Sequence, residues 1–202
     1  MLTENGGKIV TMDARSALAR ISVIDCRSGR VIIDDYVLPQ EPVVDYLTRF
    51  SGITSNDLDP LVSPRHLVNT RTAYLKLRLL IDRGVIMVGH GLKTDFNIVN
   101  VFCPPAQIID TVVIFYQTRA RMIGLRFLVN YLFGHDMQTD THDSIEDARA
   151  AWEVYKKAVA LKAADEFDLT LTKIYEFGRK TEWKLGVAVQ ERDGGRKLEG
   201  DR

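Results

Sequence analysis

The chain has 202 residues, and its 27 Lys and Arg residues balance its 27 Asp and Glu residues, so the formal net charge is zero. This length suits one domain with its own core, and the balanced charge gives no global mark of a nucleic-acid binder. The two cysteines are too few for a disulfide framework, and without a signal peptide or a membrane-spanning apolar run the sequence indicates a soluble, intracellular protein.

The first third of the chain predicts three strands in an antiparallel meander. Residues 8–13 form a mostly apolar run that ends in Asp13, residues 18–25 alternate between apolar and polar side chains, and residues 30–38 follow a turn at Ser28-Gly29. The loop at 14–17 contains no Gly, Asn or Pro, the residues that a tight hairpin uses. Either this loop is irregular, or residues are absent from the sequence here.

The middle of the chain predicts helices that alternate with short strands. Residues 39–64 are rich in turn formers, with a short helix over 43–50, and residues 64–83 predict a helix that stops at Gly84. Residues 85–89 predict a buried strand, and the turn at His90-Gly91 leads into a helix that ends before Cys103. Residues 107–110 predict a last short strand.

The remaining residues are mainly helical. A basic loop with Arg119 and Arg121 precedes helices over 126–133, 143–163 and 165–177. The order of elements predicts an α/β fold with a mixed sheet in a domain over 1–185, followed by a loosely ordered, glycine-rich tail over 186–202.

The longest of these helices begins at a cluster of polar residues. Asp143 can accept hydrogen bonds from the first amides of the helix, while Glu146 reaches back in a capping box. Asp147 then projects from the first turn, and His142 lies on the loop just before it. A carboxylate and an imidazole therefore lie close together at this helix start.

Three acids occupy strand ends or helix starts, which gather at one edge of an α/β sheet. These are Asp13, Asp95 and Asp147. Clustered carboxylates raise one another's pKa unless cations hold them, and ligation by oxygen alone favours Mg²⁺ or Mn²⁺. Two such ions can clamp the attacking and leaving oxygens of a phosphodiester, and His142 is suited to take the proton of an attacking water.

At these residues the sequence resembles a known family. Asp13, the run Gly89-His90-Gly91-Leu92-Lys93-Thr94-Asp95-Phe96 and the run from His142 to Ala148 resemble the three motifs of the DEDDh branch of 3′–5′ exonucleases. Four residues separate His142 from Asp147, as in that branch. Further stretches are similar to the nuclease domains of catalytic subunits of Pan poly(A)-specific deadenylases, namely 16–24, 51–54, 57–60, 74–78, 125–128 and 174–179.

The resemblance covers nearly the whole chain, from residue 8 to about residue 185, and implies a ribonuclease H-like fold. It implies a cytoplasmic enzyme that shortens mRNA poly(A) tails from the 3′ end and releases AMP with two divalent ions. It also implies, in a longer protein, an upstream β-propeller and a ubiquitin-hydrolase-like domain. The expected partners are single-stranded poly(A) RNA, a pseudokinase-like regulatory subunit and poly(A)-binding protein, without a membrane.

The first motif departs from the family pattern. The family has Asp-x-Glu followed by Phe-Val and a loop, whereas Arg15-Ser16 directly follows Asp13-Ala14 in this chain. Either a loop that contained the glutamate is absent here, or the chain is continuous and impaired, because an arginine cannot bind Mg²⁺. Three hypotheses result: a deadenylase, a catalytically silent RNA-binding or scaffolding module, and a general 3′ exonuclease on other RNA or DNA.

Adenine specificity would come from stacked bases, since neutralising phosphates carries no sequence information. Phe96 and residues 123–127 are candidates for the groove that holds these bases. The alternative for Phe96 is that it packs in the core under its own helix.

Overall fold

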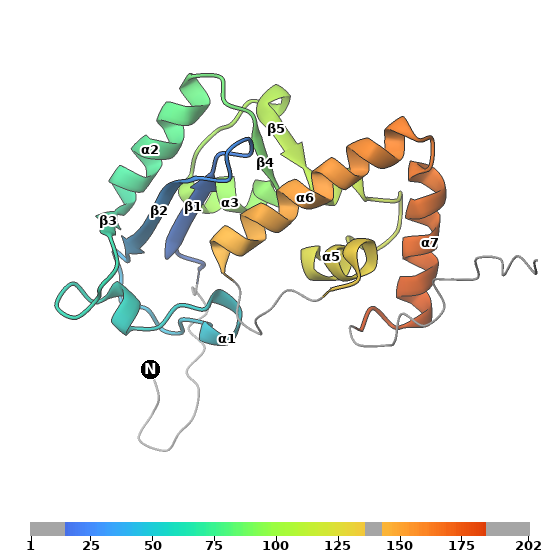
Figure 1. The fold of residues 1–202 in the computed structure, drawn as a ribbon. Helices are drawn as coiled ribbons and strands as arrows, with labels where there is room; N and C mark the ends of the chain where they lie inside the picture. The colour runs from blue at the N-terminus through green and yellow to red at the C-terminus, as the bar shows by residue number, and fades with distance from the viewer. Residues whose placement is uncertain (1–14, 136–142, 185–202) are drawn as a thin grey trace, which may run out of the picture.

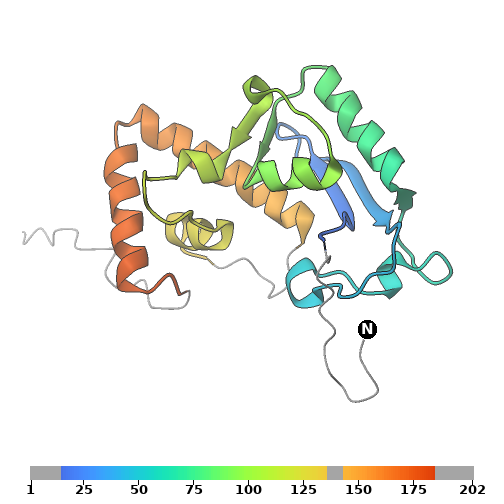
Figure 2. The same cartoon turned by 180° about the vertical axis from the view of Figure 1, so that it is seen from behind.

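The computed structural model describes residues 15–135 and 143–184, in which helices flank short strands on both faces (Figure 1). Helix α6 (Ser144–Ala163) crosses in front of the strands in Figure 1, and α3 (Leu92–Val99) lies in front of them in the reverse view of Figure 2. This confirms the predicted α/β class, with antiparallel and parallel strand pairs. The predicted first strand over 8–13 and the tail over 186–202 lie outside the described residues.

The two predicted strands at the start of the described chain are confirmed. Strand β1 (Arg20–Ile24) pairs antiparallel with β2 (Val31–Leu38). The turn between them closes through a hydrogen bond from the Asp25 amide to the Arg30 carbonyl at 2.8 Å. Gly29 occupies the left-handed region at φ 71°, which explains why glycine stands at this predicted turn.

Strand β3 (Leu67–Asn69) replaces the first turn of a predicted helix. The helix expected from residue 64 is wrong over 64–69, because residues 64–66 lie in no helix and residues 67–69 pair parallel with the end of β2. Helix α2 (Thr70–Asp82) begins directly afterwards, where the Asn69 side chain accepts a hydrogen bond from the Thr72 amide at 2.8 Å. Of the helix expected over 43–50, only α1 (Thr48–Ser51) forms, and the 3₁₀ turn η1 (Asn56–Leu58) follows it.

A second pair of strands forms a parallel βαβ unit. Strand β4 (Met87–Gly89) pairs with β5 (Ile108–Asp110), and α3 and the 3₁₀ turn η2 (Pro105–Gln107) connect them. The short helix α4 (Thr111–Ile114) begins where β5 ends. The carboxyl ends of β4 and β5 therefore lie side by side, in register at Gly89 and Asp110.

Three helices form the rest of the structure around the largest apolar cluster. Helices α5 (Leu125–Phe133), α6 and α7 (Phe167–Lys180) agree with prediction apart from their bounds, and α5 and α7 lie beside α6 (Figure 1). The interior between them is lined by Phe115, Leu128, Val154, Ile174 and Tyr175, each at most 1% exposed. None of the helices in the described ranges has the length and apolarity that crossing a membrane requires.

Candidate active site

The start of α6 has the predicted cap. The Asp143 Oδ1 atom accepts hydrogen bonds from the Ile145 amide at 2.9 Å and the Glu146 amide at 3.2 Å. The Asp147 amide donates to the Asp143 carbonyl at 2.9 Å, the first hydrogen bond of the helical ladder. The cap therefore sets the turn that carries Asp147, while the return bond from the Glu146 side chain stays a prediction.

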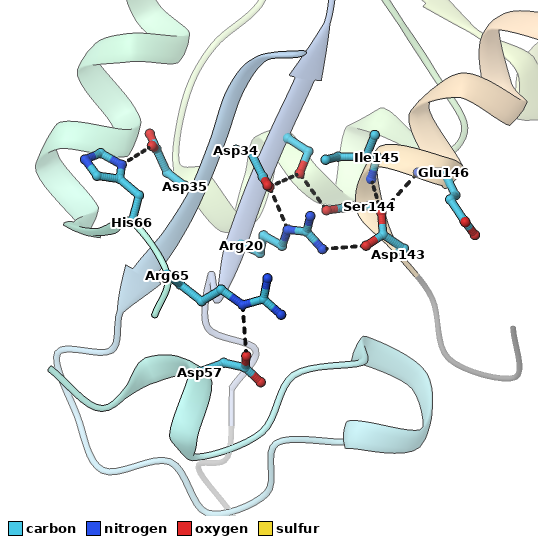
Figure 3. Close-up of polar contacts among 11 residues, drawn as sticks. Arg20, Asp34, Asp35, Asp57, Arg65, His66, Asp143, Ser144, Ile145 and Glu146 are labelled. Atoms are coloured by element: carbon cyan, nitrogen blue, oxygen red, sulfur yellow. Dashed lines mark hydrogen bonds and ion pairs between the residues drawn. The ribbon is translucent and has the colours of Figure 1, made fainter. Parts of the chain in front are cut away.

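The same capping carboxylate is joined to the sheet. Arg20 donates from Nη1 to the Asp143 Oδ2 atom at 2.9 Å and from Nε to the Asp34 Oδ1 atom at 2.7 Å (Figure 3). Burial alone would raise the pKa of Asp143, but the hydrogen bonds from Arg20 and from the helix amides lower it below its usual range. Asp143 therefore stays ionised while it caps the helix.

The second part of the site is the turn from β4 into α3. Asp95 lies in the first turn of α3 and is exposed. The turn itself is held by Asp110 at the end of β5, whose carboxylate accepts from the amides of Gly91, Leu92 and Val112 at 2.8, 2.9 and 3.0 Å. Gly91 has a φ of 87°, which few other residues adopt. Asp110 therefore fixes the backbone from which Asp95 projects.

Electrostatics around Asp95 favour a cation. Desolvation by the surrounding protein raises the pKa of Asp95, although part of the residue remains exposed, and the negative charge of Asp110 raises it further. A bound cation would relieve both effects. Asp95 and Asp147 offer carboxylate oxygens, which are the ligand atoms that Mg²⁺ and Mn²⁺ prefer. The chemical type of these side chains therefore suits the predicted ions.

His90, which precedes the turn, is held inside the protein. Its Nε2 atom lies 3.0 Å from the Ile123 carbonyl, and its Nδ1 atom lies 2.8 Å from the Thr111 hydroxyl, which also contacts the Gly89 carbonyl at 2.9 Å. Burial lowers the pKa of His90, so the neutral imidazole is favoured. With both ring nitrogens engaged, His90 joins β4, α4 and the loop before α5.

Two predicted site residues, Asp13 and His142, lie outside the described residues. Within residues 15–135 and 143–184, no group of three or more His, Cys, Asp or Glu side chains is arranged to hold a metal ion. The predicted three-carboxylate site therefore stays a prediction. Arg15, the residue that departs from the family pattern, is exposed and donates to the Glu41 carboxylate at 2.7 Å.

The residues expected to stack on adenine are mostly buried. Phe96 is 8% exposed and packs with Leu77, Met87 and Val99, so the alternative of core packing is confirmed. Ile123 and Phe127, in the second candidate stretch, are 2% and 7% exposed and belong to the largest apolar cluster. These three side chains offer no face on which a base could stack.

Sequence reasoning missed the roles of Arg20, His90 and Asp110. Asp110 carried a usable signal, because it is the last residue of a buried strand. Asp13 was predicted to stand in the same position, and a carboxylate at the end of a buried strand needs a hydrogen-bond donor or a cation. Arg20 carried a weaker signal as a charged residue within an alternating strand. His90 was interpreted as part of a turn and of the second motif, since nothing local indicates its contact with Ile123.

The chain is similar to known nucleases. The exonuclease family model RNase_T matches residues 7–155. The catalytic subunit PAN2 of the PAN2-PAN3 deadenylation complex of Gallus gallus is 45% identical over 191 residues, which are 91% of this chain and 16% of that protein. This chain therefore spans about a sixth of the length of that relative.

Solved structures agree with this similarity. The Pan2 catalytic unit of Neurospora crassa, with protease and nuclease domains, is 45% identical at a TM-score of 0.75. The match covers 79% of this chain and 27% of the Neurospora crassa chain. The pseudoubiquitin hydrolase-RNA exonuclease module of Saccharomyces cerevisiae Pan2, in complex with A7 RNA, is 42% identical at a TM-score of 0.81. That match covers 86% of this chain and 30% of the yeast chain.

Proposed function

Because this chain belongs to the exonuclease family, we propose that it is a nuclease module that shortens poly(A) tails of mRNA from the 3′ end and releases AMP. One observation carries the proposal: the 45% identity to a deadenylase catalytic subunit extends over 91% of this chain. The likeness to a yeast module solved with A7 RNA supports single-stranded poly(A) as the substrate.

Four residues have proposed roles in hydrolysis. Asp13, Asp95 and Asp147 would hold two divalent ions, Mg²⁺ or Mn²⁺. When bound, such ions supply stabilisation of negative charge on the attacking and leaving oxygens. The raised pKa of Asp95 supports its part, since a carboxylate that is costly to ionise alone gains most from a nearby cation.

His142 would act as the general base. A neutral imidazole accepts the proton of the attacking water as the water oxygen forms a bond to the phosphorus of the last phosphodiester. The bond from that phosphorus to the 3′ oxygen of the preceding nucleotide breaks, and this oxygen takes up a proton from solvent. The products are AMP and an RNA one nucleotide shorter, with a 3′ hydroxyl group.

The proposal includes an assembly. The name of the Gallus gallus relative describes a catalytic subunit of a two-protein deadenylation complex. That name supports a partner subunit. From the family resemblance we further propose that this subunit is pseudokinase-like, that the protein acts in the cytoplasm and that poly(A)-binding protein brings it to mRNA tails.

A second candidate function rests on the first motif. Arg15 directly follows Asp13-Ala14, where the family has a second carboxylate. In this alternative the chain binds RNA or organises a complex without cleaving. A third candidate, a general 3′ exonuclease, shares the chemistry of the first and differs only in substrate.

The test is a time course of 3′ shortening on 5′-labelled RNAs. We expect an A-only RNA to be trimmed one nucleotide at a time in Mg²⁺ and not in excess EDTA. Tails interrupted by a few guanosines or pyrimidines should slow at the interruption, equally at two ionic strengths. The Asp147→Asn variant is the matched control and should lose activity.

Each other outcome identifies a different function. Equal trimming of all RNAs would replace the deadenylase with a general exonuclease. Binding of A-only RNA without cleavage, in a chain whose intact mass matches the printed sequence, would favour the silent module.

A further inference from the structure

We propose that Arg20 is a positioning residue that clamps the first turn of α6 to the sheet and so sets where Asp147 presents its carboxylate. This inference rests on the proposed function, because it concerns how the chain holds one of the proposed metal ligands. It assigns a role to a residue that lies on β1, far from α6 in the sequence.

The geometry at Arg20 is that of a bridge between two carboxylates. Its guanidinium binds Asp34 on β2 at 2.7 Å and Asp143 at 2.9 Å, and its side chain is 12% exposed (Figure 3). Arginine suits such a bridge because its planar group presents several donors in fixed directions. Lysine would place one point charge between the two acids.

A second contact, between Ser22 and Ser144, also joins β1 to the start of α6. Ser22, two residues along β1 and on the same face, has its hydroxyl 2.7 Å from the Ser144 hydroxyl and 3.0 Å from the Asp34 carboxylate. Ser22 and Asp34 are also opposite each other in the β1–β2 register. The sheet therefore contacts both the capping residue of α6 and the first residue of the helix.

The two carboxylate oxygens of Asp143 have different hydrogen-bond donors. Oδ1 accepts the amides of Ile145 and Glu146, while Oδ2 faces Arg20. One carboxylate thus closes the helix end and attaches it to β1. Because Asp147 follows exactly one hydrogen-bonded turn later, a shift of Asp143 moves Asp147 with it.

Stability alone is a poor explanation for this arrangement. The Arg20 side chain is 12% exposed, but those of Asp34 and Asp143 are 33% and 42% exposed. Such partly buried ion pairs contribute little net stability, because desolvation and solvent screening offset much of the attraction. The apolar side of α6 already packs in the core through Ala151, Val154 and Ala158, each at most 2% exposed. What Arg20 adds is orientation of the helix start, and ligand positions matter to within about 0.5 Å in a preorganised site.

The test compares Arg20→Lys and Asp143→Asn with the control Arg65→Lys. Asparagine at 143 keeps an oxygen for the cap but loses the charged oxygen that faces Arg20. Arg65 is a matched control, since its guanidinium lies 5.0 Å from the Tyr36 ring centroid, as that of Arg20 does, but its ion pair is with Asp57.

Three properties of each chain are measured: Mn²⁺ binding by electron paramagnetic resonance, amide exchange at Ile145 and Glu146 without metal, and the melting temperature. We expect Arg20→Lys and Asp143→Asn to weaken Mn²⁺ binding about tenfold, because the first turn of α6 would no longer be held where it presents Asp147, and groups that orient a metal ligand contribute about this much. Exchange at both amides should become faster in both variants. The melting temperature should change little in Arg20→Lys, which keeps a positive charge, and should fall in Asp143→Asn, because the cap loses its ionised acceptor and Arg20 loses one of its two carboxylates. Arg65→Lys should match the wild type.

Unchanged exchange at Ile145 and Glu146 in both variants would overturn the clamp. So would Mn²⁺ binding within twofold of the wild type in both, because Asp147 would then keep its position without Arg20. A wild-type chain that binds no Mn²⁺ would overturn the proposed function instead. The amide exchange, which uses no metal, still decides the role of Arg20 in that case.

Discussion

Carboxylates in this protein differ in what surrounds them, and the difference separates those that hold the backbone from those that can hold a ligand. Asp110 accepts three backbone amides, and Asp143 accepts two amides and an arginine. Asp95 has a raised pKa and lies near a second negative charge. The first two stabilise the fold, whereas Asp95 costs stability unless a cation is bound.

We predict that Asp95→Asn stabilises the metal-free chain. Removing the charge ends the repulsion from Asp110, but solvent screens an exposed group, so the gain should be small, about 1 to 2 °C in melting temperature. The measurement is thermal denaturation in EDTA and in Mg²⁺. Asp110→Asn is the contrasting variant and should lower the melting temperature, because three amides lose an ionised acceptor. An unstable Asp95→Asn chain in EDTA would contradict the prediction.

His142→Ala should slow hydrolysis by about 10² to 10⁴, the usual contribution of a positioned general base, and leave metal binding mostly intact. Single-turnover rates between pH 6 and 9 test this prediction, with Mn²⁺ binding measured on the same samples. Equal rates for wild type and variant across that range would remove His142 from the mechanism.

His90 predicts a pH dependence of stability. Burial lowers its pKa in the folded chain, so the unfolded chain binds the proton more readily. Stability is therefore complete above about pH 6.5, the unfolded pKa of histidine, and falls as pH decreases toward the folded pKa. Urea denaturation at pH 7.5 and 5.5 should show a smaller loss in His90→Gln than in the wild type. An equal loss in both would assign the dependence to other groups.

Individual residues were predictable where their role is local. The Asp143 cap depends on amides two and three residues away, and the sequence displays all of them. Phe96 could not be assigned in this way, because its burial depends on Leu77 and Met87, which only the tertiary fold brings to it. The same limit hid the contact between His90 and Ile123.

At the scale of elements, α7 organises the loop that follows α4. The Tyr175 hydroxyl accepts from the Gln117 amide at 3.1 Å and lies 2.8 Å from the Arg121 carbonyl, and the residue is 1% exposed. One buried hydroxyl therefore ties both ends of this loop to the helix.

We predict that Tyr175→Phe lowers the free energy of unfolding by about 1 to 3 kcal/mol, because a buried amide and carbonyl lose their partner. Chemical denaturation measures the loss. The control is Tyr116→Phe, at a position 40% exposed, which should change stability little. Equal stability of the Tyr175 variant and the wild type would mean that water replaces the hydroxyl.

Element boundaries were less predictable than the elements themselves. Leu67 and Val68 carry apolar side chains that suit the helix that follows, yet residues 67–69 form β3 because the edge of β2 offers them hydrogen-bonding partners. Periodicity within a segment contains no information about such a partner. The helices α5, α6 and α7 were predicted closely because their apolar faces repeat within the segment itself.

At the scale of the whole molecule, α6 connects two regions. Its first turn is tied to β1, and its later turns pack against α5 and α7 (Figure 1). The fold class was predictable because the order of strands and helices is written in the sequence. The convergence of the site stays a prediction, because Asp13 and His142, two of its four residues, lie outside the described ranges.

The ion pair between Arg20 and Asp143 has a consequence for folding during synthesis. The two residues are 123 positions apart, so Asp143 leaves the ribosome about 6 to 25 s after Arg20 at ordinary rates of synthesis. Throughout that interval β1 and β2 can form, but the start of α6 does not yet exist. The start of α6 can therefore be fixed against β1 only after the segment around Asp143 has emerged, so β1 and β2 form before the helix turn that they hold.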